Sequence, residues 1–291
     1  MHKPLDQQAI VITGASSGIG LATATLAAER GASLMLLARS QQALQRIRDA
    51  LSAGGATVDF AVVDVADRDA LERAAETVMR RHGRIDTWIN NAGASIYARL
   101  EEGTEEDHRR LFETNFWGVV NGSLVALPYL RRSGGALVNL GSELSEAVIP
   151  LQGMYCASKH AVKGFTDALR VEVEELDEAG VSITLIQPTA VNTPYPQHAR
   201  NYMDREPKLP GVPIDPFQVA QAILDAATNG GRDVKVGAMA SVDIAINQLL
   251  PTFGDRFAAL QGSQQQQDRP PVDPEGNLHR PTEDGRVHGH A

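Results

Sequence analysis

Short apolar runs alternate with helical patterns through the first two thirds of the chain, and this alternation most limits what the chain can fold into. The runs are nearly continuous in Val, Ile, Leu and Ala, as expected of parallel strands that are covered on both faces. The sequence therefore predicts an α/β fold with a doubly wound, mostly parallel sheet and helices on both faces. We expect about seven strands, at 9–13, 33–38, 58–64, 86–90, 136–141, 182–187 and 233–237, and helices near 18–30, 41–53, 68–82, 104–132, 153–179 and 216–229.

The chain has 291 residues, which is enough for one large domain, and we expect a single domain over residues 1–260. Residues 188–215 contain six prolines and little periodicity, which predicts a long irregular loop that borders a substrate site. Residues 261–291 are poor in core-forming side chains, so we expect an extended or disordered C-terminal tail.

Composition limits the partners of the chain. With 27 basic and 36 acidic residues the net charge is −9, which argues against nucleic acid. No run of about 18 apolar residues is present, so no membrane span is expected. The single cysteine, Cys156, excludes an intrachain disulfide framework and favours the cytoplasm. The terminal HGH is more typical of a solvated tail than of a ligand set, and no metal site is predicted.

The segment TGASSGIG follows the first predicted strand and opens the first predicted helix. Its glycines allow a sharp turn and a close approach to a pyrophosphate, whose charge suits a helix N-terminus. The spacing G-x-x-x-G-x-G differs from the G-x-G-x-x-G of many dinucleotide folds, and an ordinary tight turn is the alternative. The predicted cofactor contacts here are Gly14, Ser16, Ser17, Gly18, Ile19 and Gly20.

Two further strand ends favour a dinucleotide. Asp64 closes the third predicted strand, where its carboxylate could accept a hydrogen bond from an adenine amino group. The segment NNAG closes the fourth, beside the crevice where strand order would reverse and where such sheets bind ligands. Simple turns are the alternative for both. The predicted contacts are Asp64, Val65, Asn91, Ala92 and Gly93.

The second predicted strand ends in Ala38-Arg39-Ser40, without the Asp or Glu that usually meets a free ribose diol. Arg39 could hold a 2′-phosphate through its planar guanidinium, with Ser40 adding a hydroxyl. A solvated arginine is the alternative. We therefore predict NADP(H), rather than NAD(H), as the cofactor.

In YCASK, Tyr155 and Lys159 are one helical turn apart and share a face. Lowering the pKa of a tyrosine by about three units requires about 4 kcal/mol of phenolate stabilisation. An ammonium about 5 Å away, at an effective dielectric constant near 20, supplies on the order of 3 kcal/mol. When a tyrosine and a lysine at this spacing occur without other motifs, they are more often a packed tyrosine beside a solvated lysine. The surrounding motifs therefore decide between a packing role and a chemical role.

Taken together, TGASSGIG, NNAG, Asn115 in TNFWG, Ser142 in NLGSE and YCASK resemble the short-chain dehydrogenase/reductase family, over roughly residues 8–237. The resemblance implies a Rossmann-like fold and an NADP-dependent oxidoreductase that moves a hydride between nicotinamide and a carbonyl or secondary alcohol. It implies that Tyr155 is the acid/base, that Lys159 binds the nicotinamide ribose, that Ser142 binds the substrate oxygen and that Asn115 helps to hold a water.

By the same resemblance, Pro188, Val191 and Thr193 bind the nicotinamide end of the cofactor. The chain departs from the family at Thr189, where a glycine is common. It also departs at Ser16 and Ser17, where NADP-dependent members often carry Lys or Arg.

The predicted substrate wall mixes apolar and aromatic residues, which favours a medium-sized, partly hydrophobic small molecule. By resemblance, helices 104–132 and 153–179 pair between subunits in a homodimer or homotetramer. A non-catalytic NAD(P)-binding regulator is the alternative function, and a sugar-nucleotide epimerase would need a larger substrate lobe. The expected wall comprises Ser95, Ile96, Tyr97, Glu143, Leu144, Met154, Thr189 and the loop 194–213.

Overall fold

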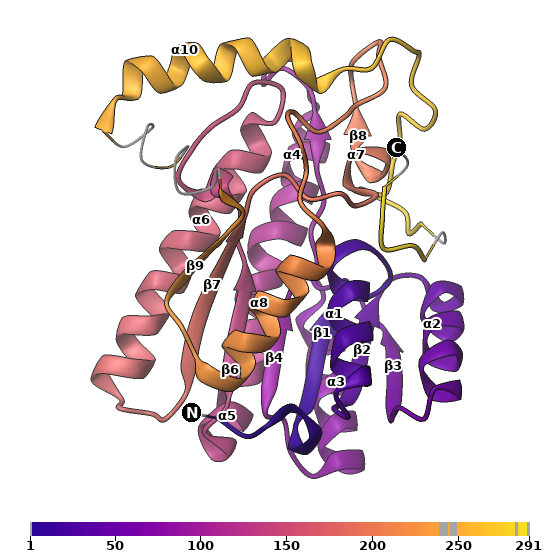
Figure 1. Cartoon of the computed structure of the whole chain (residues 1–291), viewed down its shortest axis with the longest axis vertical. Helices are drawn as coiled ribbons and strands as arrows, with labels where there is room; N and C mark the ends of the chain where they lie inside the picture. Colours follow the sequence, from indigo (N-terminus) through magenta and orange to yellow (C-terminus); the bar gives the residue numbers. More distant parts are fainter. Residues whose placement is uncertain (1, 239–243, 245–248, 283–284, 290–291) are drawn as a thin grey trace.

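The computed structural model describes the whole chain except residues 1, 239–243, 245–248, 283–284 and 290–291. Within the described residues, seven parallel strands form one sheet in the order β3-β2-β1-β4-β6-β7-β9 (Figure 1). The strands are β1 (Ala9–Thr13), β2 (Ser33–Ala38), β3 (Val58–Val62), β4 (Thr87–Asn90), β6 (Ala136–Leu140), β7 (Ser182–Pro188) and β9 (Asp233–Val236). Strand order reverses between β1 and β4, which places a ligand-binding crevice at their carboxyl ends.

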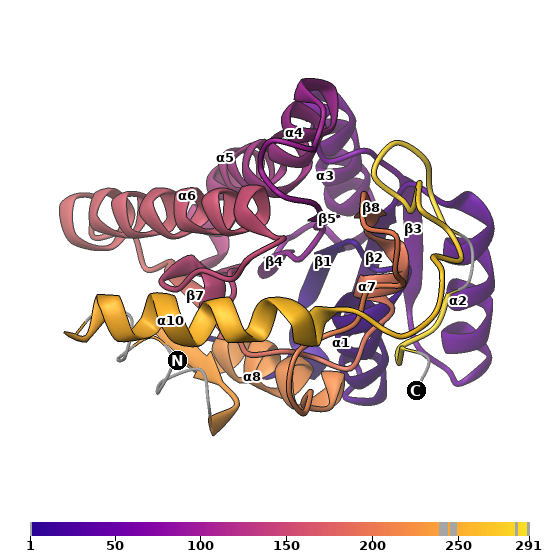
Figure 2. The same cartoon turned by 90° about the horizontal axis from the view of Figure 1, so that it is seen from above.

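Helices cover both faces of this sheet (Figures 1 and 2). Successive side chains of a strand point to opposite faces, so each strand contributes side chains to an apolar core on each face of the sheet. Ile10 and Ile12 of β1 pack in one core with the first, second and eighth helices, while Val11 lies in the other core with the third and fifth. The helices are α1 (Gly18–Glu29), α2 (Gln41–Ala53), α3 (Arg68–His82), α4 (Glu105–Phe112), α5 (Gly118–Ser133), α6 (Gly153–Arg170), α7 (Tyr195–His198), α8 (Pro216–Asn229) and α10 (Pro251–Gly262).

The predicted doubly wound sheet is confirmed, and two of the predicted helices are interrupted. A π-helical turn, Glu113–Trp117, separates α4 from α5, and a second, Val171–Leu176, follows α6. The first of these turns carries Asn115, whose side chain is fully buried and bonds the main chain of Ala94. Isolated π turns often occur beside functional sites, because they shift side chains out of the regular helical register.

The irregular segment after β7 lies at the carboxyl edge of the sheet. It holds α7 and a short strand, β8 (Arg200–Asn201), which pairs with β5 (Ile96–Tyr97). The sequence analysis did not identify α10, which Figure 1 shows lying across this edge above α6. Beyond α10, the described part of the C-terminal tail runs back over the first half of the sheet (Figure 2), and Leu278 is fully buried there.

Candidate active site

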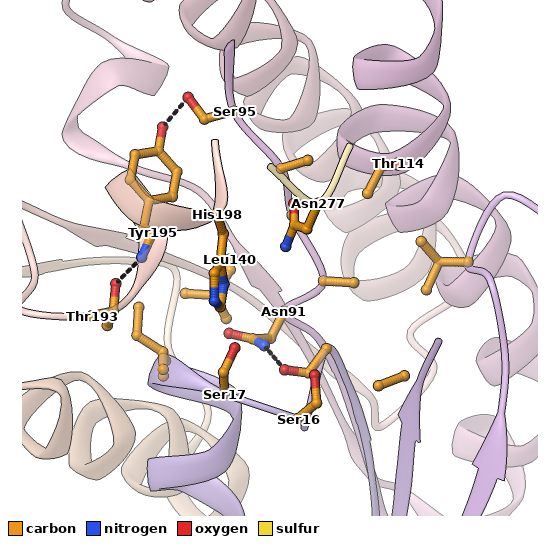
Figure 3. Close-up of a pocket in the computed structure, with 18 of the residues that line it drawn as sticks. Ser16, Ser17, Asn91, Ser95, Thr114, Leu140, Thr193, Tyr195, His198 and Asn277 are labelled. Carbon is orange, nitrogen blue, oxygen red and sulfur yellow. Dashed lines mark hydrogen bonds between the residues drawn. The ribbon is translucent and has the colours of Figure 1, made fainter. Parts of the chain in front are cut away.

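A cavity opens at the carboxyl ends of the strands, where strand order reverses (Figure 3). Most of the residues predicted to contact a dinucleotide line it together: Gly14, Ser16, Ser17, Gly18, Ile19, Arg39, Asp64, Val65, Asn91, Ala92, Gly93, Tyr155, Lys159, Pro188 and Thr193. Gly20 and Ser40 do not line this cavity, and Val191 lines an adjoining one.

The glycine positions of the turn after β1 are too tight or too strained for a larger residue. Gly14 has φ +65° and Gly18 has φ +54°, the left-handed region that favours glycine. A Cβ atom on Gly14 would lie 2.7 Å from Ala92 Cα, and one on Gly20 would lie 2.3 Å from the carbonyl oxygen of Gly14. The main chain at Gly14, Gly18 and Gly20 therefore carries no side chains beside the start of the 12-residue helix α1, which fits the pyrophosphate of NAD(P).

Asn91 and Thr13 tie this turn to the end of β4. The Asn91 side-chain amide donates to the carbonyl oxygens of Thr13, at 2.9 Å, and Gly14, at 3.1 Å. The Thr13 hydroxyl oxygen accepts from the backbone amides of Asn91, at 3.0 Å, and Ala92, at 3.1 Å. These bonds explain why the sequence carries an asparagine at this strand end: its side chain holds the glycine turn in place.

Tyr155 and Lys159 lie one turn apart on α6 and share the cavity. The Lys159 Nζ atom is 5.7 Å from the Tyr155 ring centroid and donates to the carbonyl oxygen of Leu140 at 2.7 Å. The hydroxyl of Tyr155 hydrogen-bonds with the side chains of Ser142 and Tyr195. Side chains from the turn after β6 and from the loop after β7 therefore meet at the hydroxyl of Tyr155 on α6.

Burial dominates the protonation of this pair. It raises the pKa of Tyr155 well above its usual value, although the hydrogen bonds from Ser142 and Tyr195 act in the opposite direction. Burial also lowers the pKa of Lys159, to about 8. At neutral pH, Tyr155 therefore holds its proton while Lys159 is mostly charged.

Asn115 lies behind the cavity wall. Its Oδ1 accepts from the amide of Ala94 at 2.8 Å, and its Nδ2 donates to the Ala94 carbonyl oxygen at 3.0 Å and to Ser158 Oγ at 3.1 Å. In this arrangement the side chain fixes the main chain that leads into Ser95.

The end of the cavity beside β2 and β3 holds contacts that were not predicted from the sequence. Asp64 pairs with Arg110 of α4, a partner 46 residues away in the sequence. Arg39 donates to main-chain carbonyl oxygens of the C-terminal tail, including that of Leu278 at 3.0 Å. Burial and the charge of Arg110 lower the pKa of Arg39, and Asp64 partly opposes them. Ser40 caps α2 by accepting from the amide of Ala43 at 3.1 Å.

A second cavity adjoins the first at Tyr155, Pro188, Thr193 and Tyr195. Its wall includes residues from the turn after β6, from the loop after β7 and from α10: Ser142, Glu143, Leu144, Thr189, Leu209, Val212, Phe257 and Leu260. The predicted wall residues Glu143, Leu144, Thr189 and part of the loop 194–213 therefore lie where we expected a substrate.

Three predicted wall residues, Ile96, Tyr97 and Met154, do not line either cavity, so their placement was wrong. Ile96 and Tyr97 form β5, whose pairing with β8 buries both side chains. Met154 packs against a small apolar cluster that includes Ile96. Ser95 lines the first cavity, and its hydroxyl lies 2.7 Å from that of Tyr195 (Figure 3).

The described residues also bear on a metal site and on a membrane span. No group of three His, Cys, Asp or Glu side chains there could hold a metal ion, and His290 lies outside the described residues. None of the helices in the same part of the chain is both long and apolar enough to span a membrane.

Comparison with known proteins agrees with this geometry. The family model described as short chain dehydrogenase matches residues 8–204. YxnA, an uncharacterized oxidoreductase of Bacillus subtilis, is 40% identical over 258 residues, which cover 88% of this chain and 72% of that protein.

Two solved structures are similar. An alcohol dehydrogenase from the archaeon Thermococcus sibiricus, complexed with 5-hydroxy-NADP, is 29% identical with a TM-score of 0.67; the match covers 79% of this chain and 94% of that one. A short chain dehydrogenase/reductase from Burkholderia phymatum in complex with NAD has a TM-score of 0.78 over 94% of this chain and 99% of that one. At 24% identity, this second likeness supports the fold alone.

Proposed function

The chain belongs to the short-chain dehydrogenase/reductase family of oxidoreductases, and from that premise we propose that it transfers a hydride between NADP(H) and a carbonyl or secondary alcohol. In this proposal Tyr155 is the acid/base, Ser142 binds the substrate oxygen and Lys159 supports the phenol and the cofactor ribose.

One observation carries the proposal: Tyr155 lines both cavities, whereas Lys159 lines only the first and Ser142 only the second. A group that exchanges a proton with the substrate beside a bound nicotinamide must face both molecules. Ser142 and Lys159 then flank Tyr155 on the substrate side and on the cofactor side.

The protonation state of Tyr155 suits a proton donor. Because burial raises its pKa, its hydroxyl holds a proton that it can give to a carbonyl oxygen as negative charge develops there. Ser142 can donate a second hydrogen bond to the same oxygen. In the oxidation direction Tyr155 must first lose its proton, and the ammonium of Lys159 favours that loss.

When bound, NADP(H) supplies or accepts the hydride. The glycine turn at Gly14 and the start of α1 would hold its pyrophosphate, and Pro188 and Thr193 line the nicotinamide end. Lys159 would donate to the ribose, since its Nζ carries three N–H groups and the Leu140 carbonyl oxygen accepts from one of them.

Two features support NADP(H) over NAD(H). The described cavity has no carboxylate at the end of β2, where an acidic side chain would meet a free ribose diol. Arg39 stands there instead. Its guanidinium has five N–H groups, and the tail carbonyls of Asn277, Leu278 and Arg280 accept from three, which leaves donors for a 2′-phosphate.

The second cavity favours a partly hydrophobic small-molecule substrate. Leu144, Val212, Phe257 and Leu260 supply apolar side chains to its wall, while the polar groups Ser142 and Tyr155 meet at one end. This pattern suits a molecule that has one carbonyl or hydroxyl group and an apolar body.

Exposed and buried residues on and beside α5 and α6 support the proposed homo-oligomer and the proposed cytoplasmic location. Trp117, Leu124 and Val171, on or beside α5 and α6, are 37–49% exposed, which supports pairing of these helices in a homodimer or homotetramer. Cys156 is buried and unpaired, which is consistent with the reducing cytoplasm.

The proposal is tested by following NADPH oxidation with ketones and aldehydes of graded size and apolarity. We expect turnover with members of the panel that have an apolar body, and none in a Tyr155→Phe variant that binds NADPH normally. Binding of NADPH without turnover of any carbonyl or alcohol would instead support the non-catalytic regulator.

A further inference from the structure

The C-terminal tail borders the cavity to which we assign the dinucleotide. Asn277, 14 residues from the last residue of the 291-residue chain, lines that cavity together with Arg39, Asp64 and the glycine turn. Figure 3 shows its side chain entering the cavity opposite Asn91. The tail therefore supplies part of the wall at the adenosine end.

Main-chain atoms of the tail hold the two arginines at this end. Arg39 donates to the carbonyl oxygens of Asn277, Leu278 and, at 3.4 Å, Arg280. Arg110, which pairs with Asp64, also donates to the Leu278 carbonyl oxygen, at 3.3 Å. The positions of these guanidinium groups thus depend on the tail.

The side chain of Asn277 carries an acceptor atom that receives no hydrogen bond from the described residues. Its Oδ1 is buried and has no hydrogen-bond partner among the described residues. A buried acceptor without a donor is costly, so native structures rarely leave one unsatisfied. The adenosine half of a dinucleotide offers the missing donors, since it carries an adenine amino group and ribose hydroxyls.

Contacts with the rest of the chain hold this part of the tail in place. Leu278 is fully buried among apolar residues that include Ile96 and Leu111. His279 Nε2 lies 2.7 Å from Asp107 Oδ1 on α4, and the Asn277 amide donates to the His198 carbonyl oxygen at 2.7 Å. These contacts join the tail to α4 on one side and to α7 on the other.

A second described run of the tail crosses the phosphate end. The carbonyl oxygen of Arg286 accepts from the amide of Gly18, at the start of α1, at 3.0 Å. Val287 packs against the core beneath α1, and His288 lies 3.2 Å from Asp215 Oδ2. The described tail residues 276–280 thus lie at the adenosine end, and residues 286–288 lie at the start of α1.

Resting on the proposed function, we propose that this tail is a retaining wall of the NADP(H) site. The segment Gly276–Arg280 closes over the adenosine half, and the carboxamide of Asn277 binds that half directly. A wall across the outer side must move before the cofactor leaves, so it slows dissociation more than it slows association.

The test measures the NADPH dissociation rate, by stopped-flow displacement with excess NADP⁺ and nicotinamide fluorescence as the signal. Leu278→Ser removes the anchor, and Val272→Ser, at an exposed position of the same tail, is its matched control. Asn277→Ala removes the cofactor contact, and Asn229→Ala, at the exposed last residue of α8, is its control.

We expect at least ten-fold faster dissociation for Leu278→Ser and about three- to ten-fold faster dissociation for Asn277→Ala, which corresponds to loss of about one hydrogen bond. Both controls should match the wild-type protein. If NADPH dissociation is unchanged in both variants, or if only the association rate increases, the tail does not retain the cofactor. The proposed binding of NADPH is unaffected by either result. If the wild-type protein binds neither NADPH nor NADH, the proposed function fails and this inference fails with it.

Discussion

Lys159 Nζ lies 5.7 Å from the centre of the Tyr155 ring; Lys159 is buried and Tyr155 is half-buried. Burial acts on the two residues in a related way: it raises the pKa of the phenol and lowers the pKa of the amine. Both shifts favour the neutral forms of the side chains. The pair therefore needs its remaining partners, Ser142, Tyr195 and a bound cofactor, to bring the phenol into its working range.

The buried amine makes stability depend on pH. The pKa of Lys159 falls from 10.5 to about 8 in the folded protein, so between these values the unfolded chain binds the extra proton and stability rises with pH. Relative to Lys159→Met, the wild-type protein should gain at most about 3 kcal/mol in unfolding free energy from pH 8 to pH 10.5.

Urea unfolding of both proteins at several pH values measures this gain, and Lys208→Met, at an exposed position, is the control. A difference between wild type and Lys159→Met that stays constant across this range contradicts the assigned pKa.

Tyr195 is predicted to support Tyr155. Its hydroxyl lies 2.7 Å from Ser95 Oγ and 2.8 Å from Gln152 Oε1, and its hydrogen bond to Tyr155 lowers the pKa of that phenol. Tyr195→Phe should therefore shift the rising, acid-side limb of the pH profile of alcohol oxidation to higher pH and reduce kcat about five-fold, as expected for a bond of about 1 kcal/mol. Tyr129→Phe, on α5, serves as control; identical pH profiles for Tyr195→Phe and wild type argue against this role.

Arg39 should set the coenzyme preference. Arg39→Asp removes the guanidinium and places a carboxylate near the 2′-phosphate, so NADPH binding should weaken about 10- to 100-fold more than NADH binding. Fluorescence titration with each nucleotide measures both affinities. Loss of the tail contacts affects the two nucleotides alike, so only the difference reports on the phosphate. Equal losses remove the 2′-phosphate assignment.

Subunit pairing should depend on the apolar surface near α6. Val171 exposes 49% of its surface, and Val171→Glu would place a charge in the proposed interface. We expect sedimentation velocity to show a dimer or tetramer for the wild-type protein and a smaller species for the variant. A monomeric wild-type protein contradicts the pairing.

The strands and most helices could be predicted from sequence because their signals are local. The helical patterns predicted α2, α3 and α8 at 41–53, 68–82 and 216–229, and these bounds agree with the structure. The π turn at Asn115 was missed because it goes with a contact to Ala94, 21 residues earlier, that no local pattern reveals.

The nucleotide cavity was also predictable in large part, since glycine turns and strand ends carry their own patterns. The contacts of Arg39 were not, because Leu278 lies 239 residues further along the chain. Tyr97 was misplaced because an aromatic residue after NNAG suits either a cavity wall or a buried strand, and the choice depends on β8. The contacts of Arg39 and the burial of Tyr97 thus depend on packing between segments far apart in the sequence, which local patterns do not predict.

The central claim is that Tyr155 transfers the proton as hydride moves. The most direct measurement is the single-turnover rate of NADPH oxidation by a ketone substrate, in wild-type and Tyr155→Phe proteins saturated with NADPH, with the NADPH dissociation constant measured separately. The account predicts that the variant binds NADPH within about three-fold of wild type while hydride transfer slows by about 10²- to 10⁴-fold, the range of acid–base catalysis. Equal hydride-transfer rates in the two proteins would contradict it.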